Sequence, residues 1–443
     1  MRTVFVALDT TRYDRLSCYG NARPTTPNID KLAERGVIFK NAYASDVPTQ
    51  PCFTSLFSGR RGVKTGIVTH GQAEETILEP RVPFFPEVLA SEGVQTAAVS
   101  TLYSFSSWFA RGFQHYMRPK YAASVQKVIA DDINELALPW LRAYGQKDFF
   151  LFLHYWDPHT PYHLIPDRYW NIFYNGDPYD PENRSLEPNK EIAAWWNFKR
   201  WAVHALGDGT REVTDIEYVL ARHDACIRYV DEKVGEVVEV LEEMKVLDDT
   251  LFIFFSDHGE AFTEHDCAID HVSCYEEVCH VPLVFSHSSL ASGGREVDSL
   301  VQMIDVAPTL LEWFGVPVPE QYQGRSLWPV IREETEKLYD AVYCNQGLWQ
   351  ANRMIRTHRW ALIKNIDTGV WEKPATELFD MKEDPKQTRN VYDTEPEAAA
   401  ELEVRLARWL EGQLGARPDP LRVSVERGIA GTRMREAQQR GNR

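Results

Sequence analysis

The 443-residue sequence has few cysteines and no long apolar stretch. Its seven cysteines are odd in number and scattered, which does not fit a framework of paired disulfides and predicts a reducing, cytoplasmic setting. No run approaches the roughly 18 apolar residues that a membrane-spanning helix needs, so we expect no membrane partner. A strand begins almost at Met1, which leaves no room for a secretory leader, and we expect none.

Positive charge is also in short supply. The chain has 48 Lys and Arg residues against 65 Asp and Glu residues, which gives a formal net charge of -17. Such a surface repels phosphate backbones, so we expect no nucleic acid partner. A small anionic ligand stays compatible with this charge, because a bound metal ion can reverse the local field inside a pocket.

Short apolar runs alternate with segments of helical spacing over most of the chain. The runs cover residues 3–8, 94–100, 149–154 and 250–256, and residues 217–244 carry apolar positions at helical spacing. This alternation predicts an α/β fold with a large, mostly parallel sheet sandwiched by helices.

The pattern of predicted elements changes after about residue 340, where we expect short antiparallel strands. We predict a catalytic domain over 1–339, a small C-terminal antiparallel-sheet α+β subdomain over 340–419, and an extension over 420–443. The extension is rich in arginine and thin in large apolar residues, so it should not fold alone. We expect it to pack on a neighbouring subunit of a homo-oligomer; a disordered tail is the alternative.

Polar residues follow three of the predicted strands at the point where each strand ends. Asp9, His154 and Asp257 occupy these positions, and His258 follows Asp257 directly. In open parallel sheets, functional residues gather just beyond the carboxyl ends of the strands. Two carboxylates and an imidazole there can converge on one divalent cation. The alternative is a set of loops with no ligand role.

A further candidate is Thr49, which precedes an apolar stretch of helical character. The free N–H groups and the dipole of a helix N-terminus stabilise anions. A hydroxyl placed there can attack a tetrahedral phosphorus or sulfur if a metal lowers its pKa. The competing interpretation is that Thr49 only caps the helix.

Seven groups of residues, in order along the chain, resemble the motifs of the sulfatase family in the alkaline phosphatase superfamily. They are Asp9–Gly20 with Thr26–Asp30, Gly36–Tyr43, Asp157–Tyr162, Ser256–Glu260, Tyr275–Glu277 with Val281–Leu283, Asp305–Leu311, and Glu377–Asp380 with Asp384-Pro385. The resemblance extends from residue 3 to about residue 392. It implies a metal-dependent hydrolase that acts on phosphoric or sulfuric esters.

The sequence departs from the family at the nucleophile. Sulfatases use a cysteine or serine that is oxidised to formylglycine, and counting back from Gly59-Arg60 puts that position at Thr49. Threonine cannot be converted, because its Cβ carries an extra methyl group. Thr49 resembles the threonine of the phosphodiesterase and phosphonate monoester hydrolase-like subgroup. Cys52, three residues later, is expected to be a small buried residue.

The resemblance also implies roles for particular residues. The expected metal ligands are Asp9, Thr49, Asp257 and His258; the expected catalytic residues are Thr49, His159 near the leaving oxygen and Arg60 orienting Thr49; the expected substrate contacts are His271, His154, Thr101 and Tyr103. One divalent ion is expected. A set with few acids and one imidazole suits Mn²⁺ or Zn²⁺ better than Ca²⁺, although Ca²⁺, Mg²⁺ and a second metal stay open.

Together these observations predict a small anionic ester as substrate. We expect cleavage of phosphate diesters or phosphonate monoesters through a covalent Thr49 intermediate. The alternatives are a sulfuric ester hydrolase of the arylsulfatase kind that works without formylglycine, a transferase or mutase that passes the group to another alcohol, and a non-catalytic binding protein.

Overall fold

The computed structural model describes residues 1–71, 77–122, 124–192, 195–267, 269–290 and 293–433. The chain forms two compact units. The first unit comprises residues 1–40, 86–270 and 281–297, and the second comprises residues 41–85, 271–280 and 298–443. Each of these units is assembled from separate stretches of the sequence, and the predicted domain boundaries stay a prediction. Each unit is described by itself below.

A nine-stranded sheet runs in the order β10-β2-β9-β7-β1-β6-β4-β5, with β8 paired to β2. The five strands from β7 to β5 are parallel, and β9 is antiparallel to both β7 and β2. The mostly parallel sheet confirms the predicted fold class. Its strands are β1 (Arg2–Leu8), β2 (Gly36–Tyr43), β4 (Gln95–Val99), β5 (His115–Met117), β6 (Phe149–Tyr155), β7 (Thr250–Phe255), β8 (His280–Val281), β9 (Leu283–Ser286) and β10 (Arg295–Gln302).

The central strand β1 sets the position of the site residues. Strands β6 and β7 flank it and are buried along their whole length, as expected for apolar runs in a parallel sheet. The register pairs Ala7 with His154 on one side and with Phe255 on the other. The carboxyl ends of the three strands therefore coincide.

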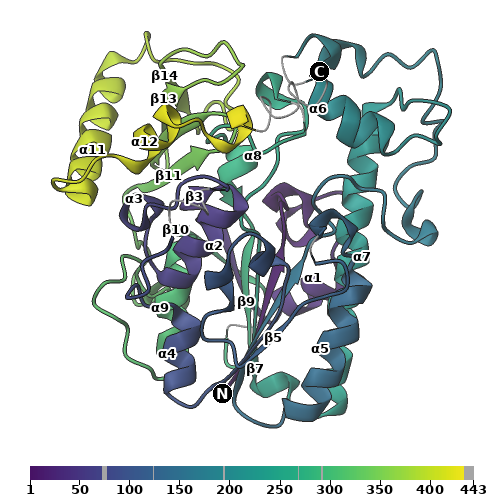
Figure 1. Cartoon of the computed structure of the whole chain (residues 1–443), viewed down its shortest axis with the longest axis vertical. Coiled ribbons are helices and arrows are strands. Elements are labelled where there is room, and N and C mark those ends of the chain that lie inside the picture. Colours follow the sequence, from purple (N-terminus) through teal and green to yellow (C-terminus); the bar gives the residue numbers. More distant parts are fainter. Residues whose placement is uncertain (72–76, 123, 193–194, 268, 291–292, 434–443) are drawn as a thin grey trace. The chain divides into compact units, whose positions relative to one another are not determined.

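Helices of the first unit pack beside these strands. In Figure 1, α5 and α7 lie side by side, and α5 also packs against β4 and β6. The long helix α7 begins after Asp215, whose carboxylate accepts a hydrogen bond from the Glu217 amide at 2.9 Å. The helices that lie wholly or mostly in this unit are α1 (Pro27–Ala33), α4 (Phe85–Ser91), α5 (Ala130–Tyr144), α6 (Trp195–Phe198) and α7 (Ile216–Glu243).

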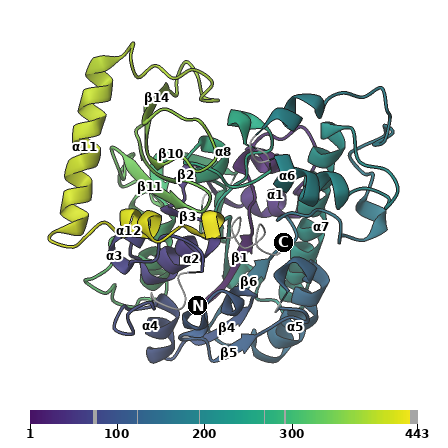
Figure 2. The ribbon, with the colours of Figure 1, turned by 45° about the horizontal axis from the view of Figure 1, so that its top comes forward.

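The second unit contains a five-stranded sheet in the order β14-β13-β12-β11-β3. Its C-terminal strands are antiparallel, whereas the short β3 joins the edge in parallel to β11. Figure 2 shows α11 and α12 beside this sheet, and both contact β12. The strands are β3 (Asp46–Val47), β11 (Val342–Gly347), β12 (Ala351–Arg356), β13 (Trp360–Asp367) and β14 (Thr376–Asp380). The helices are α2 (Thr49–Ser58), α3 (Gly62–Thr65), α8 (Glu276–Cys279), α9 (Val306–Trp313), α10 (Trp328–Ile331), α11 (Pro396–Leu414) and α12 (Pro420–Glu426).

The C-terminal extension packs on its own chain as far as the structure describes it. Leu421 is fully buried in a cluster with Val68 and Ala351. Next to it, the buried Arg353 guanidinium pairs with Asp419 at 3.0 Å. Residues 420–433 thus pack at least partly on their own chain, and an arm on a neighbouring subunit stays a prediction. The oligomeric state itself stays a prediction.

Among the described residues, no helix is both long and apolar enough to cross a membrane.

Candidate functional site

In the first unit, the carboxylate of Asp9 lies directly beyond the end of β1. Its amide continues the sheet by donating to the Tyr155 carbonyl at 3.0 Å. One carboxylate oxygen contacts Nε2 of His154 at 2.9 Å, and the other accepts from the Thr10 hydroxyl at 2.6 Å. Asp9 and His154 are fully buried. The structure thus brings these two predicted residues together through the β1–β6 register.

Asp257 and His258 follow β7 on the other side of β1. The Asp257 carboxylate accepts from the Thr10 amide at 3.1 Å, and His258 Nε2 lies 3.3 Å from its second oxygen. Thr10 has a positive φ of 56°, a strained conformation for a β-branched residue that turns its amide toward Asp257. Thr10 therefore links Asp9 to Asp257.

Ser256, which sequence reasoning missed, holds the loop that carries Asp257 and His258. The Ser256 hydroxyl donates to the His258 carbonyl at 2.6 Å and accepts from the Thr11 amide at 2.8 Å. The signal was present, since Ser256 stands immediately before Asp257 in the motif. Ser256 joins the loops after β1 and β7.

The electrostatics of this cluster fit a cation. Burial, reinforced by the negative charge of Asp9, raises the pKa of Asp257 to about 6. Burial also acts to raise the pKa of Asp9, but the hydrogen bond and charge of His154 outweigh it and lower that pKa. Two adjacent buried carboxylates with imidazole nitrogens beside them form a donor set that suits Mn²⁺ or Zn²⁺. Asp9, Asp257 and His258 could therefore hold a divalent ion, with His154 orienting Asp9.

His159 lies on the loop after β6, where its ring stacks on Trp156 with centroids 4.4 Å apart. Its Nδ1 lies 2.8 Å from the Thr160 carbonyl. Burial lowers the pKa of His159, although the charge of Asp9 opposes the shift. The lowered pKa favours the neutral form of His159, in which the contact with the Thr160 carbonyl assigns the proton to Nδ1 and the lone pair to Nε2.

Thr101 and Tyr103, both predicted substrate contacts, have different environments. Thr101 is fully buried, and its hydroxyl lies 3.5 Å from Nδ1 of His154, next to that of Ser100 at 3.3 Å. Tyr103 is 41% exposed. Its amide donates to the hydroxyl of Tyr116 at 2.9 Å. Of the two, the structure brings only Thr101 to His154.

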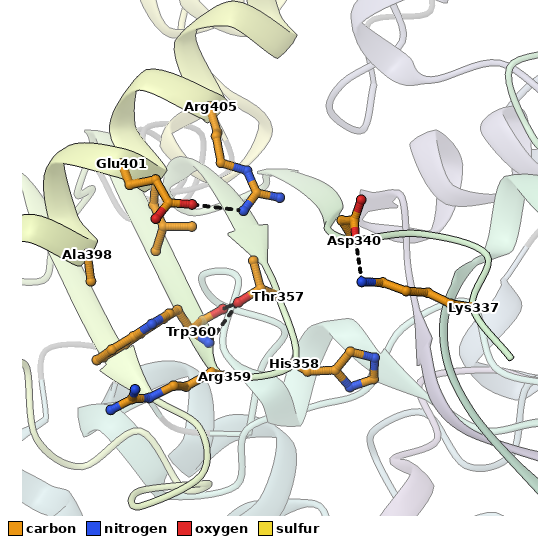
Figure 3. A pocket seen from close by; sticks show the side chains of 10 residues that line it. Lys337, Asp340, Thr357, His358, Arg359, Trp360, Ala398, Glu401 and Arg405 are labelled. Atoms are coloured by element: carbon orange, nitrogen blue, oxygen red, sulfur yellow. Dashed lines mark hydrogen bonds and ion pairs between the residues drawn. The ribbon is translucent and has the colours of Figure 1, made fainter.

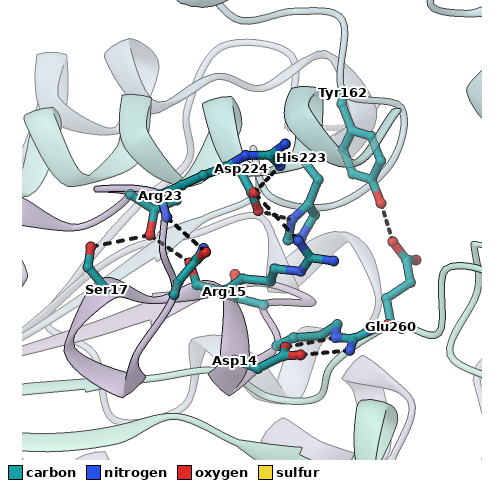
Figure 4. Close-up of polar contacts among 12 residues, drawn as sticks. Asp14, Arg15, Ser17, Arg23, Tyr162, His223, Asp224 and Glu260 are labelled. Atoms are coloured by element: carbon teal, nitrogen blue, oxygen red, sulfur yellow. Dashed lines mark hydrogen bonds and ion pairs between the residues drawn. The ribbon is translucent and has the colours of Figure 1, made fainter. Parts of the chain in front are cut away.

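A polar network joins the two motif loops that follow β6 and β7 (Figure 4). Tyr162 donates a hydrogen bond to the carboxylate of Glu260, and both side chains are buried. Nearby, the guanidinium groups of Arg15 and Arg23 lie 3.5 and 2.7 Å from the buried carboxylate of Asp224. Sequence reasoning missed these contacts, because each links segments far apart in the chain.

In the second unit, Thr49 is the first residue of α2 and follows β3 after one proline. It is 1% exposed. Pro48 occupies the N-cap position, so Thr49 begins the helix and does not cap it. Its position at a helix N-terminus suits a group that binds or attacks an anion. Cys52 lies in the first turn of α2 and is buried, as predicted.

Arg60 lies beyond the opposite end of this helix. The ten residues of α2 span about 15 Å, and Gly59 ends the helix with a positive φ of 61°. Burial and the positive charge of Arg417 lower the pKa of Arg60, and the negative charge of Glu79 opposes the shift. The prediction that Arg60 orients Thr49 is corrected, because the length of α2 separates the two residues.

His271 is connected to the strand that leads into Thr49. Its side chain is 7% exposed, and its carbonyl accepts from Nε2 of Gln346 at 3.0 Å. Gln346 lies on β11, in register with Val47 of β3. The second unit thus contains Thr49 and His271, and the first contains Asp9, Asp257, His258, His154 and His159.

A pocket of about 620 Å³ opens in the C-terminal part of the second unit (Figure 3). Around it, Arg405 pairs with Glu401 at 3.3 Å, and Lys337 pairs with Asp340. None of its lining residues is a predicted site residue. We therefore assign no part of the proposed chemistry to it.

Comparison with known proteins gives two family matches. The model of the sulfatase family matches residues 2–316, and that of the N-sulphoglucosamine sulphohydrolase C-terminal region matches residues 264–413. A Delta 4,5-hexuronate-2-O-sulfatase of Bacteroides thetaiotaomicron is 24% identical over 403 residues, which cover 85% of this chain and 81% of that protein.

Two solved structures show the same fold. One, in complex with its substrate D-glucosamine-2-N,6-O-disulfate, has a TM-score of 0.76 at 21% identity and covers 95% of this chain and 99% of its own. The other, a phosphonate monoester hydrolase of Agrobacterium radiobacter, has a TM-score of 0.71 at 20% identity and covers 93% and 96%.

Proposed function

We propose that Thr49 is the nucleophile of this chain, which belongs to the sulfatase family and hydrolyses sulfuric or phosphoric esters. The observation that carries the proposal is the position of Thr49 as the buried first residue of α2. Helix N–H groups there stabilise the oxygens of a tetrahedral anion. The methyl group on the threonine Cβ excludes conversion to formylglycine, so the hydroxyl itself must attack.

Enzymes of this family generally depend on a divalent metal. We propose that Asp9, Asp257 and His258 hold one ion together with Thr49. Such an ion supplies Lewis acidity, which lowers the pKa of a hydroxyl and offsets charge on the reacting group. The two buried carboxylates support this proposal, because a cation would offset the cost of holding both charges away from water.

The remaining residues bind the substrate and move protons. His159, neutral with an acceptor Nε2, is suited to take a proton from the water that releases the group from Thr49. As substrate contacts we propose His154 and Thr101, which lie next to Asp9 in the first unit. We also propose His271, which lies in the second unit with Thr49. A cytoplasmic location and a homo-oligomer stay predictions.

For the substrate class we propose phosphate diesters or phosphonate monoesters. A formylglycine hydrate can expel sulfate from its own carbon, because it has a second hydroxyl. A threonine ester lacks that route, so water must attack its phosphorus or sulfur atom. A divalent metal ion would assist this attack well on a phosphoryl group. A phosphonate monoester hydrolase among the proteins of the same fold supports this reading.

A second candidate is a sulfuric ester hydrolase that works without formylglycine. The observation that favours it is the sequence similarity to a hexuronate sulfatase along most of the chain. In that case a sulfated saccharide would be the substrate, and the sulfur of a threonine sulfate would be attacked by water.

A panel of aryl esters separates the two candidates. Metal-stripped protein, restored with Mn²⁺ or Zn²⁺, is assayed with a sulfate, a phosphate monoester, a phosphate diester and a phosphonate monoester. We expect the largest kcat/KM for the diester or the phosphonate, with Thr49→Ala as the inactive control. Turnover of the sulfate ester alone, still dependent on Thr49, would retain the nucleophile and reject the phosphorus substrate class.

A further inference from the structure

Three cysteines that the proposed reaction does not use converge in the second unit. Cys274 lies on the loop before α8, Cys279 ends α8, and Cys344 lies on β11. All three side chains are fully buried, and their sulfur atoms lie within 4.8 Å of one another. Cys274 and Cys279 are 70 and 65 residues from Cys344 in the sequence. Tertiary folding therefore brings the three side chains together.

The contacts within the cluster are sulfur contacts. Cys279 Sγ lies 3.2 Å from Cys344 Sγ. Burial acts to raise the pKa of Cys274, but hydrogen bonds from the other two thiols and the charge of Arg353 outweigh it and lower that pKa to about 6. Burial raises the pKa values of Cys279 and Cys344. Three sulfur atoms from two segments of the chain therefore lie together in a fully buried cluster.

A fourth sulfur is placed on the same face of the sheet. Met354 of β12 is directly opposite Cys344 in the antiparallel pair, and it is fully buried. Directly paired residues of antiparallel strands present their side chains on one face with Cβ atoms about 5 Å apart. The cluster thus offers three thiol sulfurs and one thioether nearby, all of them soft donors.

We propose that Cys274, Cys279 and Cys344 form a binding site for one Cu⁺ ion. Thiolate and thioether ligands select this soft cation, whereas a structural zinc site takes four thiolate or imidazole ligands. Each cysteine releases its thiol proton to solvent as its sulfur binds the ion. No electron is transferred. Complete burial protects the bound ion from water and from oxidants.

The ion would join the segment that carries the predicted site residue His271 to strand β11. Cys274 and Cys279 belong to the same short segment as His271, and Cys344 lies two residues before Gln346, which holds the His271 carbonyl. A bound ion therefore fixes residues 271–280 to β11. We expect it to raise the thermal stability of the protein, which can be measured without any substrate.

The test uses the full chain, reduced and kept free of oxygen. Copper(I) is supplied as its coloured bicinchoninate complex, and its transfer to the protein is followed by loss of colour. We expect one equivalent to transfer, a higher melting temperature, and an X-ray absorption spectrum with sulfur-only scattering around copper. No transfer, or preferential binding of Zn²⁺ in competition, would overturn the proposal.

Two serine variants test the ligands against a matched control. Cys344→Ser and Cys279→Ser should each weaken copper binding by more than about 100-fold, beyond the effect typical of outer-shell changes. Cys226→Ser, at another fully buried free cysteine in α7, should bind as the wild type does. Circular dichroism of the metal-free variants identifies any that fail to fold. Equal binding by a folded Cys344→Ser variant would reject the site.

Met354→Leu replaces the thioether by a side chain of similar volume and should therefore fold. We expect about tenfold weaker copper binding. Equal binding would assign the ion to the three thiolates alone and reject a contribution from the thioether. A mass two daltons below that of the reduced chain in the purified protein, with no copper uptake after reduction, would instead identify a redox-active Cys279–Cys344 pair and overturn the copper assignment.

Discussion

Nε2 of His154 contacts the Asp9 carboxylate at 2.9 Å, although 145 residues separate them in the chain. The contact follows from the parallel register of β1 and β6, which pairs Ala7 with His154. Because both residues are fully buried, the imidazole fixes the orientation of the carboxylate without competition from water.

The first prediction concerns this contact. His154→Asn should lower metal affinity and kcat/KM by about 10- to 100-fold, since outer partners of a metal-binding carboxylate have effects of this size. Metal titration and steady-state kinetics measure the two losses. His204→Asn, at an exposed position, is the control and should behave as the wild type does. A His154→Asn variant with full metal affinity would reject the orienting role.

The second prediction concerns the metal. Asp257→Ala should lose both bound metal and activity, because it removes a carboxylate that faces Asp9 and His258 in the same buried cluster. Elemental analysis after dialysis measures the metal content. Glu264→Ala is the control for disruption of the loop after β7, because Glu264 lies on this loop and pairs with Arg12. This variant should retain its metal. Full metal content in the Asp257→Ala variant would reject Asp257 as a metal ligand.

The third prediction concerns the nucleophile. Thr49→Ala should abolish turnover while the fold is retained, and Thr49→Ser should keep part of the activity. Intact-mass spectrometry during turnover should detect a covalent adduct that Thr49→Ala lacks. Cys52→Ala, three positions along the same buried helix, should stay active. An inactive Cys52→Ala variant together with an active Thr49→Ala variant would show that the register of the motif is wrong.

The fourth prediction concerns stability against pH. Burial raises the pKa of Asp46 to about 7 from 3.8, although Ser55, Gly62 and Asn345 donate hydrogen bonds to it. Between these two pKa values the folded state holds a proton that the unfolded state has lost. The free energy of unfolding should therefore fall as pH rises from about 4 to 7, by at most about 1.4 kcal/mol per pH unit, and level off above pH 7.

Denaturant unfolding of the wild type and of Asp46→Asn across this range measures the effect. The variant should lack this part of the slope, because an amide does not titrate. Asp393→Asn, at an exposed position, should keep it. Identical slopes for the wild type and Asp46→Asn would contradict the raised pKa.

The fifth prediction concerns the C-terminal extension. Leu421→Ala should lower the free energy of unfolding by about 2–5 kcal/mol, since it opens a cavity beside Val68 and Ala351. Glu426→Gln, on the exposed side of α12, should have little effect. Light scattering should give the same mass for Leu421→Ala as for the wild type. A smaller mass would show that the extension also holds an oligomer together.

The sequence by itself determined the strands and the residues that follow them. Apolar runs that lead into Asp9, His154 and Asp257 predict both a buried strand and a polar residue at or next to its carboxyl end. The mostly parallel sheet followed from the alternation of these runs with helices. The position of Thr49 at the start of a helix was likewise predictable from the local sequence.

Tertiary structure decided which of these residues meet. The contact of His154 with Asp9 depends on strand register, and the separation of Arg60 from Thr49 depends on the full length of α2. The burial of Leu421 and the convergence of Cys274 with Cys344 join segments that no local pattern connects. The physical reason is that hydrophobic periodicity specifies which face of an element is buried, whereas the partner of that face is selected by packing over the whole chain.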